Sequence, residues 1–168
     1  MENAKETVIN KQKINYKDFL KISVNEEHKC VAINVSAREF KKQKDYTEFY
    51  AYVDKLMVKC LRYAKEKFNK DTITILADLA GFLIKHVDYT FFKHAIPYFN
   101  DRFPDNMEKV ILVNIPVFFK ACYNVVSIFI HHDTKEKILF EKSKKFKRRF
   151  GSSKFTNNLD EIDDSDEE

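Results

Sequence analysis

The sequence predicts an α/β domain with a mainly parallel β-sheet and helices packed on it. Short apolar segments alternate with longer amphipathic ones, as in β-α-β units joined by right-handed crossovers. Residues 46–68 repeat apolar side chains every three or four positions, which predicts an amphipathic helix. Residues 110–113 (VILV) are apolar throughout, which is typical of a parallel strand covered on both faces. A chain of 168 residues that is 44% hydrophobic has enough apolar surface for one such domain.

Taken in order, the patterns predict four strands and three helices in strict alternation, beginning and ending with a strand. Strands are expected at residues 30–35, 72–76, 110–113 and 138–140, and helices at 46–68, 88–103 and 117–130. Pro97 lies inside the second helix and is expected to kink or divide it, because proline lacks the backbone donor. For residues 1–24 the pattern leaves open a short helix or an extended segment that docks on the core.

Charge is distributed unevenly along the chain. Residues 160–168 contain seven acids and no base, which leaves 30 basic against 19 acidic side chains, a net charge of +11, in residues 1–159. A body this basic favours phosphates, on lipids or on nucleic acid. The expected organisation is a polar or helical N-terminal extension (1–24), the α/β domain (25–141), a basic segment (142–156) and a disordered acidic tail (157–168).

The sequence lacks the common signatures of enzymes and metal proteins. It has only two glycines, no glycine-rich nucleotide cradle and neither GxSxG nor HExxH, so no enzyme activity and no cofactor are expected. Cys30, Cys60 and Cys122 lack metal-ligand spacing, as do the five histidines, so the thiols are expected to be buried and no metal site is expected. The charged N-terminus and the absence of a long apolar segment predict a cytosolic or nuclear protein.

Three blocks in the second half of the chain carry a family resemblance. They are ILADLAG (75–81), RFPDNMEKVILVNIPVFF (102–119) and FIHHDTKEKILF (129–140). In this order and spacing they resemble the core of CRAL-TRIO domains, the fold of secretory phosphatidylinositol-transfer, tocopherol-transfer and retinaldehyde-binding proteins. The resemblance implies a CRAL-TRIO-like lipid-binding domain at 25–141. Compared with the family, the N-terminal helical domain is missing and the C-terminal lid region is shortened.

The resemblance also implies a lipid site. Asp105 and Lys137 match positions that contact the inositol phosphate headgroup in phosphatidylinositol-binding members, where a lysine suits a phosphate and a carboxylate suits hydroxyl groups. The alternative of equal weight is a helix-end aspartate and a surface lysine. Five aromatic residues are expected either to line the lipid pocket or to fill the core: Phe91, Phe92, Phe118, Phe119 and Phe129.

A basic run follows the last expected strand. Its six cations are Lys142, Lys144, Lys145, Lys147, Arg148 and Arg149. Such a cluster is expected to contact an anionic membrane, with Phe146 and Phe150 as shallow anchors. RNA binding, nuclear import and a merely solvated face remain as alternatives.

The favoured function is lipid binding, lipid transfer or lipid sensing at cytosolic membrane surfaces, with a preference for phosphoinositides. The expected partners are therefore a phospholipid and an anionic membrane, and the expected location is cytoplasmic with peripheral membrane association. The alternative function is a degenerate CRAL-TRIO scaffold, comparable to BCH domains, that binds a small GTPase or another protein. A nucleic-acid partner is disfavoured.

Overall fold

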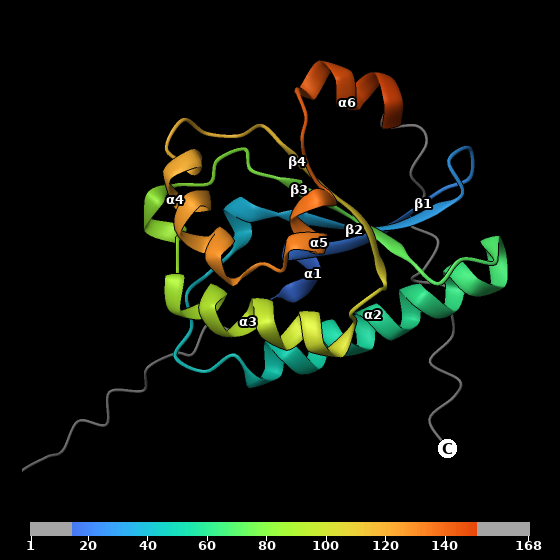
Figure 1. Ribbon diagram of the computed structural model, residues 1–168, viewed down its shortest axis with the longest axis horizontal. Coiled ribbons are helices and arrows are strands. Elements are labelled where there is room, and N and C mark those ends of the chain that lie inside the picture. Colours follow the sequence, from blue (N-terminus) through green and yellow to red (C-terminus); the bar gives the residue numbers. More distant parts are fainter. Residues whose placement is uncertain (1–14, 151–168) are drawn as a thin grey trace, which may run out of the picture.

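A computed structural model describes residues 15–150, which form a five-stranded sheet with helices (Figure 1). The strands are β1 (Leu20–Asn25), β2 (Cys30–Ser36), β3 (Ile73–Asp78), β4 (Met107–Val113) and β5 (Ile138–Phe140). Their spatial order is their order in the chain, from β1 to β5. β1 pairs with β2 antiparallel, and the other three pairings are parallel. The predicted α/β fold with a mainly parallel sheet is confirmed.

The segment that the sequence left open contains one helical turn followed by a strand. Helix α1 (Tyr16–Phe19) leads directly into β1, which pairs with β2 from Leu20 opposite Val35 to Asn25 opposite Cys30. The intervening turn is tight because Lys29 adopts a left-handed conformation (φ 49°) and the backbone N–H of His28 donates to Asn25 Oδ1 at 2.9 Å. β1 therefore extends the sheet at its N-terminal edge.

The long helices occur where the apolar periodicity predicts them. They are α2 (Thr47–Phe68), α3 (Tyr89–Arg102), α4 (Phe119–Val126), α5 (His132–Glu136) and α6 (Ser143–Phe150), with the 3₁₀ turns η1 (Ala37–Glu39), η2 (Ile84–His86) and η3 (Ser127–Phe129). α3 runs through Pro97 without being divided. The single helix expected at 117–130 is instead α4 followed by η3, and α5 and α6 were not expected.

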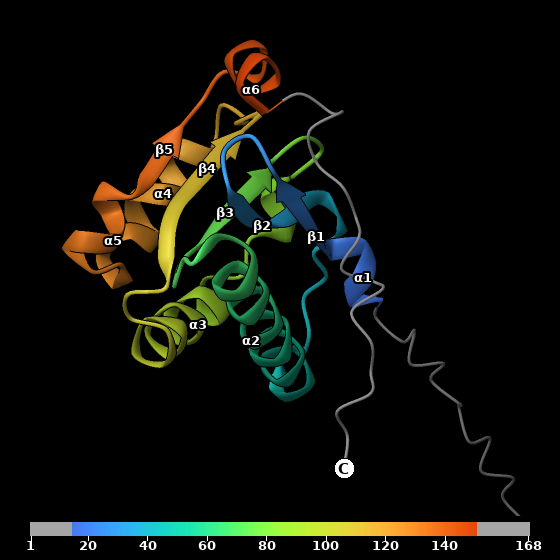
Figure 2. The same cartoon turned by 90° about the vertical axis from the view of Figure 1, so that its right-hand side faces the viewer.

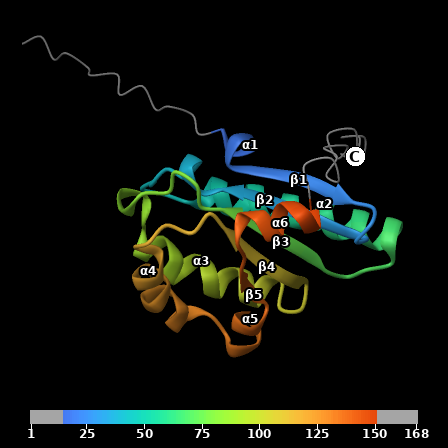
Figure 3. The ribbon, with the colours of Figure 1, turned by 90° about the horizontal axis from the view of Figure 1, so that it is seen from above.

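The strand order explains which face the helices cover. Each parallel strand is added beside its predecessor, so right-handed crossovers place all the connecting helices on the same face of the sheet. On that face α2 buries Phe49, Met57 and Cys60 against β2 and β3. α6 belongs to the other face, where Phe146 packs near Leu76 and Ile111. Figure 2 shows α6 at the opposite end of the view from α2 and α3, and Figure 3, seen from above, shows α6 in front of the sheet.

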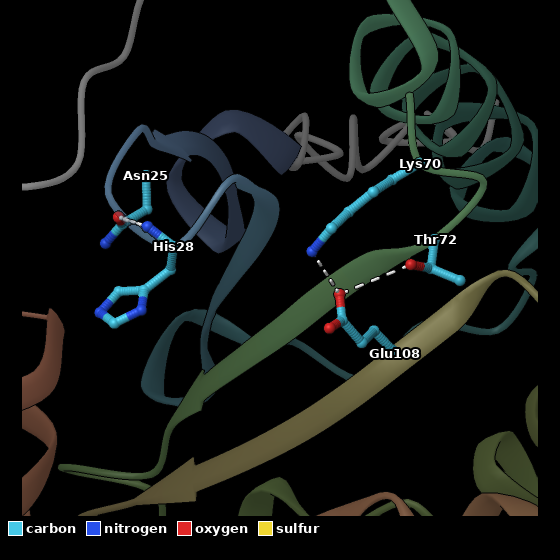
Figure 4. A network of polar contacts seen from close by, with 5 residues as sticks. All are labelled: Asn25, His28, Lys70, Thr72 and Glu108. Carbon is cyan, nitrogen blue, oxygen red and sulfur yellow. Dashed lines mark hydrogen bonds and ion pairs between the residues drawn. The ribbon is translucent and has the colours of Figure 1, made fainter. Parts of the chain in front are cut away.

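Polar contacts fix the ends of the elements. Asp88 caps α3 by accepting from the backbone N–H of Phe91 at 3.0 Å, and it also accepts from the Tyr46 hydroxyl at 2.8 Å, which ties α3 to the start of α2. Burial of Tyr46 raises its pKa to about 12, so this hydroxyl remains a donor. At the N-terminal ends of β3 and β4, Glu108 Oε2 lies 3.5 Å from both Lys70 Nζ and Thr72 Oγ1 (Figure 4).

Candidate functional site

A cavity of about 280 Å³ lies between the sheet and helices α3 and α4. Its floor includes Val35, Ala77 and Leu112, which are neighbours in register on β2, β3 and β4. Ile138 of β5 extends the floor beside Val110. These side chains share a face of the sheet because side chains alternate between the two faces along a strand.

The helices supply the larger side chains around this space. α3 contributes Phe91, Phe92 and Ile96, and α4 with the segment after it contributes Phe119, Cys122, Tyr123, Val126 and Ile130. Phe82 and Val87, on either side of η2, close one end. The small side chains of Ala37 and Ala77 leave unfilled the volume that larger aliphatic residues would occupy.

The chemistry of the lining is almost wholly apolar. Cys122 is buried, and its Sγ accepts a hydrogen bond from the Tyr89 hydroxyl across 3.4 Å. This bond raises the pKa of Tyr89 and joins α4 to the start of α3. No charged side chain lines the described cavity. Such a space favours hydrocarbon, because burying apolar surface is stabilising while an unpaired polar group would lose its hydration.

A polar turn positions α4 over the cavity. Asn114 follows β4 in a left-handed conformation (φ 54°), and its Nδ2 donates to Asp78 Oδ1 at 2.8 Å. The same carboxylate oxygen accepts from the backbone N–H of Ala80 at 2.9 Å. Gly81 is also left-handed (φ 71°), which glycine tolerates at low cost. The hydrogen bond between Asp78 and Asn114 thus joins the two loops that follow β3 and β4.

The five aromatic candidates separate into two groups. Phe91, Phe92 and Phe119 line the cavity. Phe118 and Phe129 do not belong to its lining, since Phe118 stacks on Phe82 with ring centroids 6.1 Å apart and Phe129 ends η3. Sequence reasoning missed the strand residues of the floor, although the alternation of side chains along β3 and β4 is a signal that finds them.

The two headgroup candidates lie outside this cavity. Asp105 is exposed in the turn before β4, and Lys137 is half-buried just before β5. The backbone carbonyl of Lys137 accepts from the N–H of Val110 at 3.0 Å, so its position is fixed by the sheet. Both residues precede parallel strands and so lie toward the same end of the sheet, but no ion pair joins their side chains among residues 15–150.

The basic run forms α6. Lys142, Lys144 and Lys145 are exposed, whereas the side chains of Lys147, Arg148 and Arg149 lie outside the described part of the structure, as does that of Phe150. Phe146 was expected to be a membrane anchor. It is half-buried and packs against the apolar cluster on the sheet face opposite the cavity, while membrane contact by the basic run stays a prediction.

Two other classes of site are absent from residues 15–150. No group of three or more histidine, cysteine, aspartate or glutamate side chains there is arranged to bind a metal ion. None of the helices in this range has the length and apolar character needed to cross a bilayer. All three cysteines are buried and free, and burial raises the pKa of Cys60 to about 12.

Comparisons with known proteins agree with this architecture. The phosphatidylinositol transfer protein CSR1 of Eremothecium gossypii is 32% identical over 73 residues, which cover 44% of this chain and 17% of CSR1. The crystal structure of Sfh5 matches with a TM-score of 0.65 at 19% identity, over 78% of this chain and 52% of that chain. The chain therefore aligns with about a sixth of one protein and half of the other. A model of the CRAL/TRIO domain matches residues 19–160, and the chain belongs to that family.

Proposed function

We propose that this protein binds a lipid by enclosing its hydrocarbon part in the cavity, and that it carries or presents this lipid at membrane surfaces. The observation that supports the proposal is an apolar cavity beneath α4 in a CRAL/TRIO domain. A carrier role is also supported by the lining, which among residues 15–150 contains neither a charged side chain nor a group arranged to bind a metal ion.

The size of the cavity suits part of a lipid. Ligand pockets span roughly 300–1,000 Å³, so about 280 Å³ is just below the lower end of that range. Each methylene transferred from water into such a site contributes about 0.8 kcal/mol. A short length of hydrocarbon can therefore give useful affinity, while a polar headgroup stays at the surface.

The direct test is to purify the full-length chain, extract its bound lipid and identify it by mass spectrometry. Ala77→Phe places a ring in the cavity floor and is expected to reduce the lipid recovered per protein. Val58→Phe is the matched control, because Val58 lies on α2, is 47% exposed and does not line the cavity. Parent protein that contains no lipid and acquires none from vesicles would contradict the proposal.

The proposed preference for phosphoinositides is supported by Asp105, Lys137 and the resemblance to phosphatidylinositol-binding proteins, one of which is CSR1 by its name. A lysine ammonium group forms charge-assisted hydrogen bonds with a phosphate. Lys137→Ala should therefore weaken binding to phosphoinositide vesicles relative to Lys135→Ala, which removes an exposed lysine from neighbouring α5. Equal binding by the two variants would remove the assigned headgroup site and leave the cavity unaffected.

A further inference from the structure

The sheet face opposite the cavity holds polar side chains that are buried although β1 is an edge strand. Ser23 pairs in register with Ala32, which belongs to the apolar cluster of that face, and Asn25 shares the face because side chains alternate along a strand. Ser23 is 2% exposed and Asn25 is 0% exposed. Among residues 15–150, α6 is the helix that packs on this face. Side chains this inaccessible at a sheet edge are typical of an edge that another segment covers.

Asn25 has a hydrogen-bond donor that is not used. Its Oδ1 accepts from the backbone N–H of His28 at 2.9 Å (Figure 4), but its buried Nδ2 has no hydrogen-bond partner within residues 15–150. A buried donor without an acceptor has lost its hydration and gained nothing in exchange. A group that brings an oxygen to this point would remove that cost. The site therefore fits a ligand rich in acceptors, such as a peptide with carboxylate side chains.

Charged groups surround Asn25. It pairs in register with Cys30, whose pKa is raised by burial. Glu108 raises the pKa of Cys30 further, whereas Lys70 and Lys109 lower it, so all three charges lie near this thiol. Lys70 Nζ lies 3.5 Å from Glu108 Oε2 (Figure 4), while none of the ion pairs found in residues 15–150 includes Lys109. A cation is therefore available beside the unused donor.

Lysines outnumber acids across this face. Assigned by alternation along the strands, by contact with Glu108 or by position at α6, the lysines are Lys21, Lys70, Lys109, Lys142, Lys144 and Lys145. The acids are Asp78, Glu108 and Glu141. Asp78 and Glu108 already accept hydrogen bonds from neighbouring side chains, and Glu141 is buried. The imbalance favours an acidic partner, because charges at a partly buried surface are screened less than fully exposed ones.

The chain itself supplies a segment of that chemistry close to this face. α6 packs here through Phe146 and ends at Phe150, and Figures 1 and 3 show it running from β5 toward the turn between β1 and β2. The acidic tail (157–168) follows after residues 151–156, which can span up to about 20 Å. The tail has seven acids and no base, and Leu159 and Ile162 are apolar side chains suited to the cluster around Ala32.

We propose that the sheet face opposite the cavity is a docking surface for an acidic peptide, and that the acidic tail of this chain occupies it. Carboxylates of the tail pair with Lys70 and Lys109, and an oxygen of the tail accepts from Asn25 Nδ2. The tether gives the tail a millimolar effective concentration, so a weak contact is sufficient. This inference goes beyond the proposed lipid binding and concerns the other face of the sheet, so each can fail without the other.

Cys30 reports on docking in the full-length chain. It lies on this face and is 7% exposed, whereas Cys60 is 0% exposed beneath α2 on the other face. Deleting residues 157–168 is expected to raise the alkylation rate of Cys30 about tenfold, the ratio of a millimolar effective concentration to a dissociation constant of about 0.1 mM. The rate of Cys60 should not change. Mass spectrometry of peptides from the alkylated protein measures both rates.

A variant of full length repeats this test without shortening the chain. Four acids of the tail are replaced by their amides: Asp160→Asn, Glu161→Gln, Asp163→Asn and Asp164→Asn. The variant should also accelerate the alkylation of Cys30, because the tail loses most of its attraction to the lysines. Equal acceleration of Cys30 and Cys60 would show general opening of the domain instead of release of one face, and would overturn the proposal.

A synthetic peptide of residues 157–168 tests the surface from outside. It is expected to bind the deletion variant in fluorescence anisotropy, and less tightly as salt rises. Lys70→Gln with Lys109→Gln should weaken this binding about fivefold, since each ion pair at a surface contributes modestly. Lys120→Gln is the control, because it removes an exposed lysine from α4 on the cavity side. An unchanged Cys30 rate after deletion, or equal peptide binding by the two lysine variants, would overturn the proposal.

Discussion

Single residues at the ends of β3 and β4 position the loops that lead to η2 and α4, which cover the cavity. Gly81 has φ 71°, and a Cβ added there would lie 3.3 Å from Cβ of Arg38. In the same turn, Oδ1 of Asp78 accepts hydrogen bonds both from the backbone N–H of Ala80 and from Nδ2 of Asn114. A change of backbone at this point moves η2 and α4 together, because the two loops are joined by these hydrogen bonds.

Gly81→Ala is therefore expected to destabilise the protein. The left-handed conformation costs a residue with a Cβ roughly 1–2 kcal/mol, and the close contact with Arg38 adds to that cost. Denaturant unfolding of the two proteins measures the difference in free energy. Gly81→Asn should lose less than Gly81→Ala, because asparagine tolerates this conformation better. Equal stability of parent and Gly81→Ala would contradict the assigned backbone strain.

The sequence could not separate cavity residues from core residues at this scale. Phe91 and Phe118 both occur at helical spacing, yet one lines the cavity and the other stacks on Phe82. The difference depends on where the loops after β3 and β4 meet, which periodicity within one helix does not encode. The turns after β3 and β4 are predictable from residue type, since Gly81 and Asn114 adopt the positive φ angles that glycine and asparagine favour.

Among the elements, α4 is the covering helix with the fewest polar attachments. Apart from the bond that Ser127 of adjoining η3 donates to the Asn124 carbonyl, the described part of the chain has one side-chain hydrogen bond between α4 and another element, from the Tyr89 hydroxyl to Cys122 Sγ. The other contacts of α4 with the body are apolar, through Phe119, Tyr123 and Val126. Apolar contacts lack direction, so this helix can shift at lower cost than α3, which is capped by Asp88.

Tyr89→Phe is expected to speed the release of bound lipid. Removing one hydrogen bond costs about 1 kcal/mol, which corresponds to roughly fivefold in rate if the bond is broken when α4 moves. Stopped-flow measurement of fluorescent lipid leaving the protein gives this rate. Tyr98→Phe is the control, because it deletes a hydrogen bond to Asp54 that joins α2 and α3 and touches neither α4 nor the cavity. Equal release rates for the two variants would show that the bond does not restrain α4.

Periodicity predicted elements with a clear apolar stripe and missed those without one. α2 was predicted because its buried residues recur at helical spacing. β1 (LKISVN) is short and follows a charged segment, so its pairing with β2 became evident only in three dimensions. α6 (SKKFKRRF) is almost entirely basic, and charge alone gives no signal for a helix.

For the molecule as a whole, an unfilled apolar cavity predicts that lipid contributes to stability. A ligand that binds only the folded state stabilises it by about 2.7 kcal/mol when its concentration is a hundred times the dissociation constant. Protein from which the lipid has been extracted should unfold at a lower temperature in calorimetry, and adding the lipid back should restore the original value. A single unfolding temperature across all three samples would indicate that nothing occupies the cavity.

The alternation of strands and helices was sufficient to predict the α/β architecture, but the order of the strands was not readable from it. Right-handed crossovers permit a new strand on either side of the sheet, with helices then on opposite faces. In this chain each new strand, from β3 to β5, is added at the same edge of the sheet. The cavity follows from that choice, since α3 and α4 must share the face that holds Ala77 and Leu112.

The consecutive strand order also affects how the chain can be made. Each strand pairs with the strand that precedes it in the chain, so no pairing requires a segment that is synthesised much later. The sheet can grow during translation as successive units leave the ribosome, and nearby pairing of this kind favours rapid folding. β5 is the last strand to be synthesised and contributes Ile138, so the cavity floor is completed only after the rest of the sheet has formed.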